Sequence, residues 1–129
     1  MRYNLLISIL WTIFIIVGSI ISGETLDNVS FLKIPHLDKV IHFLWYFVLF
    51  IFWYSFLLSK NYKFVSLSYR LIVFLVLSAF GLMMEIVQKL FASHRYFEIN
   101  DLLFNILGLF LGLLFFFPIY QNKFFGRFL

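Results

Sequence analysis

The stretch LIVFLVLSAFGLMMEIVQKL, residues 71–90, is an apolar run that is interrupted at Glu85 and, one helical turn later, at Gln88. At about 1.5 Å per residue, a helix of this length crosses the roughly 30 Å hydrocarbon core of a bilayer. An ionisable side chain inside such a helix is costly, and by default it marks a functional site with a partner nearby. The stretch therefore predicts a membrane-spanning helix with a functional carboxylate.

Three further stretches, at about residues 4–22, 40–58 and 102–120, are as long and as apolar. Of the 129 residues 64% are hydrophobic and 12% charged, and the mean hydropathy is +1.01. A water-soluble domain could not cover its surface with so few polar residues. We read the first stretch as a permanent helix, because its apolar core exceeds the ~7–15 residues of a signal peptide. The sequence therefore predicts one domain over residues 1–129, an all-α membrane protein built as an antiparallel four-helix transmembrane bundle.

The basic residues predict how this bundle is oriented. Four spans place the N-terminus, the second connection and the C-terminus on one side, with six Lys or Arg residues and no acidic residue. The opposite side has four Lys or Arg residues and all six acidic ones. By the positive-inside rule, we expect both termini to be cytoplasmic and the connections at 23–39 and 91–101 to face outward. The net charge of +4 is thus a topology signal, and no nucleic-acid partner is expected.

Polar residues in three of the helices lie at matching depths. One layer, roughly 6–8 Å below the outer helix ends by the rise per residue, consists of His42, Glu85 and Asn105. A second layer, one turn further out, consists of Asp38, Gln88 and Asp101, below Arg95 in the third connection. Residues three or four apart share a helix face, so the inward faces continue through Tyr46, Ser78, Gly81, Gly108 and Gly112, and on the first helix through Gly18 and Ser22. We expect these faces to converge.

The spacing of Gly108 and Gly112 is the small-residue pattern that lets two membrane helices approach closely. The pattern fits two arrangements. It can join two helices of the same chain, or it can form a homodimer.

Each polar residue also has a structural interpretation. Asp38 and Asp101 stand near helix starts, where carboxylates cap free N–H groups. His42 and Asn105 would serve as interhelical hydrogen-bonding groups, and Glu85 as a buried carboxylate paired with Arg95 or His42. For Lys39 and Lys89, we expect side chains that extend to the membrane interface.

The motifs together resemble the VanZ-like family. They are Ser22, Pro35, Asp38-Lys39-x-x-His42-Phe43-x-x-Tyr46, Glu85-x-x-Gln88-x-x-Phe91, Arg95, Asp101-Leu102-x-x-Asn105 and Gly108-x-x-x-Gly112. The resemblance spans nearly the whole chain. It implies a small multi-pass protein of the bacterial cytoplasmic (inner) membrane, in a family whose founding member is linked to resistance against teicoplanin-type glycopeptides. It implies no settled biochemical mechanism.

The first functional hypothesis is a binding protein of the cell envelope. An outward-facing polar cleft would bind an envelope lipid or a lipid-linked cell-wall precursor, with Arg95 contacting an anionic headgroup. The ligand-binding residues would be Asp38, His42, Glu85, Gln88, Arg95, Asp101 and Asn105. Such binding could contribute to glycopeptide or lipoglycopeptide resistance.

The second hypothesis is an intramembrane enzyme acting on a lipid-linked envelope substrate. Glu85 would be its general base and His42 the acid–base partner, with Arg95 and Asn105 stabilising developing negative charge. A metal variant would use Asp38, His42 and Glu85, but one histidine and two carboxylates are a weak signature, so no metal or cofactor is expected. The remaining alternative is polar packing in a membrane scaffold.

Overall fold

A computed structural model describes residues 2–21, 37–60, 66–91 and 98–121, and four α-helices account for nearly all of them. They are α1 (Arg2–Ile21), α2 (Leu37–Lys60), α3 (Leu67–Phe91) and α4 (Ile99–Gln121). All four are long and apolar enough to cross a membrane. The predicted fold class and the four-span architecture are therefore confirmed.

The helices extend a few residues beyond the predicted apolar runs, most clearly at the starts of α2, α3 and α4. The added residues bring Asp38 into the first turn of α2 and Asp101 into the first turn of α4. A carboxylate in the first turn opposes the positive end of the helix dipole, so these polar residues continue the helix beyond its apolar part. Both acidic residues therefore belong to helices, and the helix backbone sets the direction of their side chains.

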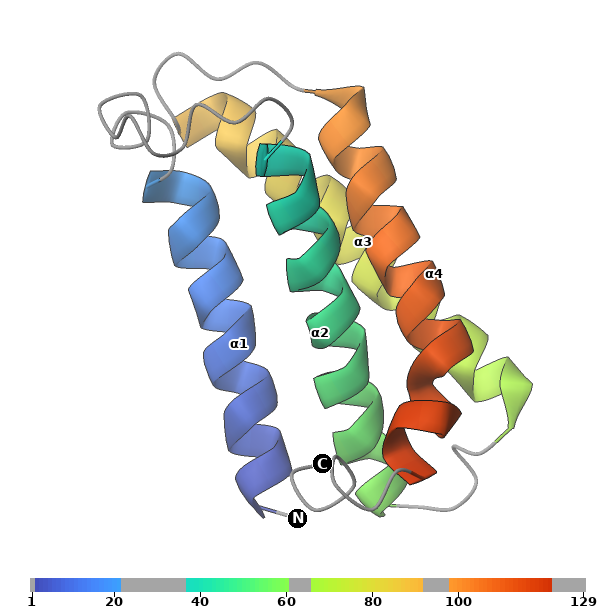
Figure 1. Cartoon of the computed structure of the whole chain (residues 1–129). Coiled ribbons are helices and arrows are strands. Elements are labelled where there is room, and N and C mark those ends of the chain that lie inside the picture. Colours follow the sequence, from blue (N-terminus) through green and yellow to red (C-terminus); the bar gives the residue numbers. More distant parts are fainter. Residues whose placement is uncertain (1, 22–36, 61–65, 92–97, 122–129) are drawn as a thin grey trace.

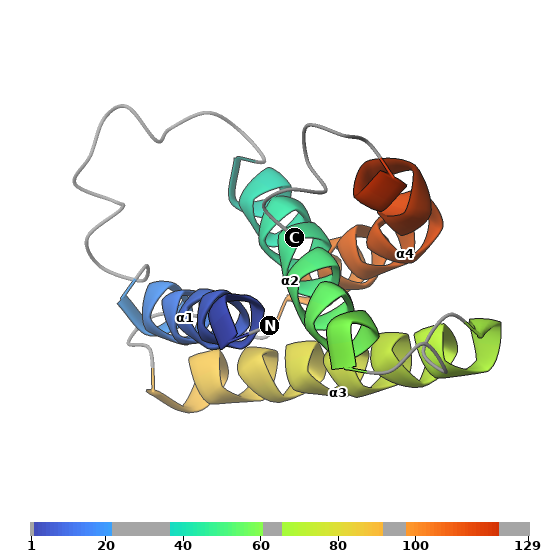
Figure 2. The same cartoon turned by 90° about the horizontal axis from the view of Figure 1, so that it is seen from below.

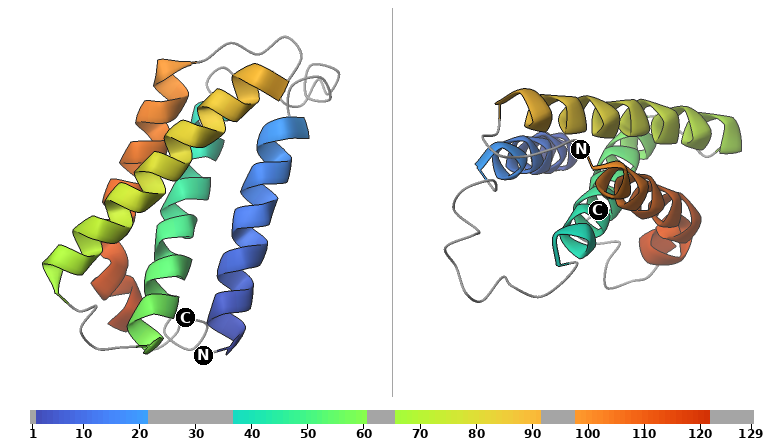
Figure 3. Two further views of the ribbon diagram at one scale, coloured as in Figure 1. Left: turned by 180° about the vertical axis from the view of Figure 1, so that it is seen from behind. Right: turned by 90° about the horizontal axis from the view of Figure 1, so that it is seen from above.

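Successive helices run in opposite directions, and the start of α1 and the end of α4 lie at the same end of the bundle (Figure 1). The most extensive pairing is that of α2 with α4, which are not neighbours in sequence and run in the same direction (Figure 1). Helix α1 packs on another side of α2, and α3 crosses obliquely over the group (Figures 2 and 3). Helix α2 is thus the central element.

The pairing of α2 with α4 depends on the glycine spacing of α4. A Cβ atom at Gly108 would lie 2.2 Å from the backbone oxygen of Phe43, and one at Gly112 would lie 2.9 Å from Cβ of Phe50. Both glycines are buried against α2 of the same chain. Of the two arrangements that the spacing allows, the structure contains the intramolecular one.

Tryptophans attach α1 to α2 by hydrogen bonds inside the apolar layer. The indole of Trp11 donates to the backbone oxygen of Trp45 at 3.0 Å, and that of Trp53 donates to Oγ1 of Thr12 at 2.9 Å. The ring of Trp45 also packs on Gly18, where a Cβ atom would lie only 2.6 Å from it. In lipid these close contacts and hydrogen bonds stabilise a helix pair that the hydrophobic effect does not hold together.

Candidate functional site

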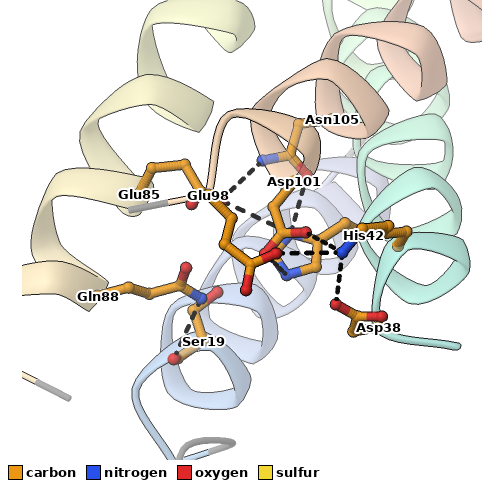
Figure 4. Close-up of polar contacts among 9 residues, drawn as sticks. Ser19, Asp38, His42, Glu85, Gln88, Glu98, Asp101 and Asn105 are labelled. Carbon is orange, nitrogen blue, oxygen red and sulfur yellow. Dashed lines mark hydrogen bonds and ion pairs between the residues drawn. The ribbon is translucent and has the colours of Figure 1, made fainter. Parts of the chain in front are cut away.

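The three residues of the inner polar layer meet between α2, α3 and α4 (Figure 4). The amide nitrogen of Asn105 donates to Oε1 of Glu85 at 3.4 Å, and its oxygen lies 3.0 Å from Nδ1 of His42. Nδ1 of His42 is also 3.8 Å from Oε1 of Glu85. Glu85, Asn105 and His42 are only 2%, 1% and 5% exposed, so they form a buried network well inside the protein.

Asp101 and Asp38 extend this network toward the end of the bundle. Nε2 of His42 lies 4.0 Å from Oδ2 of Asp101, which stands one turn before Asn105 on α4. Asp101 is buried, whereas the side chain of Asp38 is 41% exposed. The second predicted layer is therefore present, with Asp101 facing the histidine and Asp38 near the surface.

Lys39 takes a different position from the one expected. Its ammonium group contacts Oδ2 of Asp38 at 3.0 Å, Oε2 of Glu98 at 3.1 Å and Oδ1 of Asp101 at 3.4 Å, and its side chain is 13% exposed. The sequence analysis expected Lys39 to extend to the membrane interface, and the structure shows its ammonium group held by three carboxylates. Glu98 was not identified from the sequence; it directly precedes α4, and its backbone oxygen accepts from the backbone nitrogen of Asp101 at 3.1 Å.

Gln88 connects the cluster to α1. Its amide nitrogen donates to the backbone oxygen of Ser19 at 3.2 Å, and both residues are buried (Figure 4). The sequence analysis predicted that α1 would contribute Gly18 and Ser22 to the inward faces. Ser19 was missed, because it accepts through its backbone oxygen, which every residue type has. We define the polar cluster as Ser19, Asp38, Lys39, His42, Glu85, Gln88, Glu98, Asp101 and Asn105.

Two of the residues predicted at this end lie outside the described ranges, namely Arg95 and Ser22. Within the ranges that are described, the polar cluster holds four carboxylates, one lysine and one histidine. The cluster is therefore rich in acceptors and negative groups. A ligand that meets these residues directly would offer hydroxyl groups, an amine or a cation.

Tyr46 lies one helical turn below His42 on the same face of α2 and is 1% exposed. Its ring packs on Gly81, where a Cβ atom would meet Cε1 of Tyr46 at 3.1 Å and Cβ of Asn105 at 3.7 Å. In the part of the chain that the structure describes, the Tyr46 hydroxyl has no hydrogen-bond partner. A buried hydroxyl without a partner costs about 1–3 kcal/mol, so this one is available to a bound group.

A separate cavity of about 390 Å³ lies between α1, α2 and α3, in the half of the bundle away from the polar cluster. Apart from Thr12, its lining is aromatic and aliphatic, with Leu49, Trp53, Ile72, Val76 and Phe80 among the residues. On α2 the lining begins seven residues after His42, roughly 10 Å along the helix axis. We call it the apolar groove, and it suits a hydrocarbon chain.

The family model described as VanZ/LLP1 matches residues 3–121 of the chain. No curated protein and no solved structure matches it. The matched range includes the whole polar cluster, from Ser19 on α1 to Asn105 on α4.

Proposed function

The chain belongs to the VanZ/LLP1 family, and we propose that it binds the polar headgroup of an envelope lipid or lipid-linked cell-wall precursor in the polar cluster. In this proposal the protein spans the bacterial cytoplasmic membrane with both termini inside, as the distribution of basic residues favours. The polar cluster then faces outward, where such precursors are used.

The buried network of Glu85, Asn105 and His42 is the observation that carries the proposal. Burying a carboxylate, an amide and an imidazole in hydrocarbon is costly, and ionisable residues inside membrane helices mark a functional site by default. All three point into one small volume between α2, α3 and α4 (Figure 4). Convergent polar groups with an apolar surround are the usual composition of a ligand site.

The apolar groove supports a lipid as the source of the headgroup. It lies deeper than the polar cluster along α2 and α3, at the depth where the chain of a lipid would extend. One lipid could then place its headgroup against the polar cluster and its hydrocarbon chain in the apolar groove. The role in glycopeptide resistance that the family suggests would then follow from holding a lipid-linked precursor away from the antibiotic.

The experiment that tests this function is native mass spectrometry of the full chain purified in a neutral detergent. We expect wild-type protein to retain one lipid from the membrane and to take up added phosphatidylethanolamine or a polyprenyl-linked saccharide, whose amine or hydroxyl groups suit the acceptors of the polar cluster. His42→Ala removes a buried hydrogen-bonding group, which costs about 1–3 kcal/mol, so retention should fall about 5–150-fold.

Ser55→Ala is the matched control for this experiment. Ser55 is also buried, but its hydroxyl donates to the oxygen of Ile51 within the same helix, at the other end of the bundle. Retention should therefore stay at the wild-type level. If wild type retains no lipid, or if His42→Ala retains as much as wild type while remaining monodisperse, the proposal fails.

An enzyme acting on the same ligand is the second candidate. The imidazole of His42 lies 3.8 Å from a carboxylate oxygen of Glu85 and 4.0 Å from one of Asp101, which is the setting in which an imidazole can exchange a proton. The same mass spectra separate the two functions. A binding protein returns the lipid unchanged, and an enzyme returns a species of new mass.

A further inference from the structure

We propose that Arg70 forms a second binding site, for the phosphate group of an anionic phospholipid, at the end of the bundle opposite the polar cluster. Arg70 lies near the start of α3, fifteen residues before Glu85. At about 1.5 Å per residue, the two positions are roughly 22 Å apart along the helix axis. The site is therefore separate from the polar cluster, and it does not depend on a headgroup binding there.

The guanidinium group of Arg70 is held in place by an aromatic ring of α4. Its Cζ atom lies 4.9 Å from the centroid of the Phe117 ring, which is the distance of a cation–π contact. Phe117 in turn makes an edge contact with Phe116 at 5.5 Å, and Phe116 belongs to the buried core. The N–H groups of a guanidinium lie in its plane, so a ring against its face leaves them for an acceptor.

One nitrogen of Arg70 lacks an acceptor. The Nε atom is buried, and in the part of the chain that the structure describes it has no hydrogen-bond partner. A buried donor without an acceptor is costly, and more so when the group is charged. The residue as a whole is only half-buried, so part of the guanidinium remains open. Because its positive charge is delocalised over three nitrogens, an anion at the open part would stabilise the whole group.

The charge around Arg70 also favours an anion. The start of α3 lies at the same end of the bundle as the ends of α2 and α4 (Figure 1). All four carboxylates of the described ranges belong to the polar cluster, at the opposite end. The last residue of α2 at this end is Lys60, a further cation. Among the described residues, the charge at this end is therefore positive, with no carboxylate to neutralise Arg70.

The depth of Arg70 indicates a lipid as the source of the phosphate. Helix α3 has 25 residues and is about 37 Å long, which exceeds the roughly 30 Å hydrocarbon core of a bilayer. Its first turn therefore lies at the edge of that core, where the phosphate groups of lipids begin. The paired N–H groups of an arginine match two oxygen atoms of a phosphate, and the contact is charge-assisted.

With both termini inside the cell, the leaflet at Arg70 is the cytoplasmic one. Anionic lipids give the surface of that leaflet a negative potential, which attracts basic side chains. Only this assignment of the leaflet rests on the orientation proposed above.

The test is native mass spectrometry of the full chain, freed of lipid in a neutral detergent and titrated with dioleoyl phosphatidylglycerol or with dioleoylglycerol, which has the same chains and no phosphate. We expect wild-type protein to bind one phosphatidylglycerol more tightly than dioleoylglycerol. Arg70→Gln should weaken this binding by about tenfold or more, as expected for the loss of a hydrogen bond to a charged group. Arg70→Lys keeps the charge without the paired N–H groups, so it should also bind more weakly than wild type.

Lys60→Gln is the matched control, because it removes an exposed basic side chain from the same end. Its affinity for phosphatidylglycerol should equal that of wild type. Inorganic phosphate at the same concentration should not displace the lipid; if it does, the phosphate site stands with the free anion as its ligand.

The proposal is overturned if wild type binds phosphatidylglycerol no better than dioleoylglycerol, or if folded Arg70→Gln and Arg70→Lys both bind as tightly as Lys60→Gln. Because these substitutions leave the polar cluster intact, that result would not affect the headgroup proposal. Loss of lipid retention in His42→Ala would in turn leave the Arg70 site standing.

Discussion

Gly108→Ala should prevent stable folding or lower the free energy of unfolding by about 3 kcal/mol or more, at the upper end of overpacking effects. The added Cβ atom would lie 2.2 Å from the oxygen of Phe43 and 3.0 Å from the nitrogen of Phe47. Both are backbone atoms of α2, so neither can move without displacing the helix. The measurement is the thermal unfolding midpoint of the purified protein in detergent, together with its elution profile.

Gly112→Ala gives the graded comparison, and Leu107→Ala the control. At Gly112 the nearest contact is Cβ of Phe50 at 2.9 Å, a side-chain atom, so we expect a smaller loss of stability. Leu107 is 44% exposed on the outer side of α4, and its truncation should have little effect. If Gly108→Ala unfolds at the wild-type temperature, the close approach of α2 and α4 in the same chain is not the arrangement in the membrane.

Asn105→Leu should have the second largest effect, because one substitution removes hydrogen bonds from two other residues. Glu85 loses an amide donor and His42 loses the acceptor of its ring N–H, both in a buried site. We expect a loss of about 2–4 kcal/mol in the free energy of unfolding, because a buried hydrogen bond contributes about 0.5–1.5 kcal/mol and one to a charged group about 1.5–3 kcal/mol. Leucine has a similar size, so the change isolates polarity from packing.

The same variant should also retain less lipid, since His42 and Glu85 lose the group that orients them. Ser55→Ala again serves as the control, because it removes a buried hydroxyl that donates to the backbone of its own helix. If Asn105→Leu is as stable as Ser55→Ala and retains as much lipid, the network of His42, Glu85 and Asn105 contributes neither to stability nor to lipid binding.

The helices and the depth of the polar residues could be read from the sequence, because both depend on position along the chain. A long apolar run predicts a membrane-spanning helix. The number of residues from His42, Glu85 and Asn105 to the outer ends of their helices predicts that the three lie at the same depth. The structure brings these three side chains into contact, as that layer predicts.

The pairing of helices could not be read in the same way. In a membrane, an apolar helix face can pack on lipid as well as on another helix, so it does not show which helix lies beside it. Helices α2 and α4, which pair most extensively, are separated by α3 in the sequence. The glycine spacing predicted a close contact but fitted a second copy of the chain equally well. Only the three-dimensional arrangement shows α2 against Gly108 and Gly112.

The side chain of Lys39 shows the limit of reasoning from residue type. A lysine near a helix end usually extends to the interface, and no sequence pattern predicted that packing would bring Glu98 beside Asp38 and Asp101. The structure does so, because α4 packs along α2 in the same direction and its first turn lies beside that of α2 (Figure 1). Tertiary packing therefore added the fourth carboxylate, Glu98, to the three that the sequence analysis had assigned to the site.

An experimental structure of the protein in nanodiscs made from bacterial membrane lipids would test the central claim most directly. We expect density for one lipid, with its headgroup within hydrogen-bond distance of the polar cluster formed around His42, Glu85 and Asp101 and its chain along the apolar groove. A polar cluster whose groups pair only with one another, with lipids confined to the outer surface of the bundle, would contradict the account.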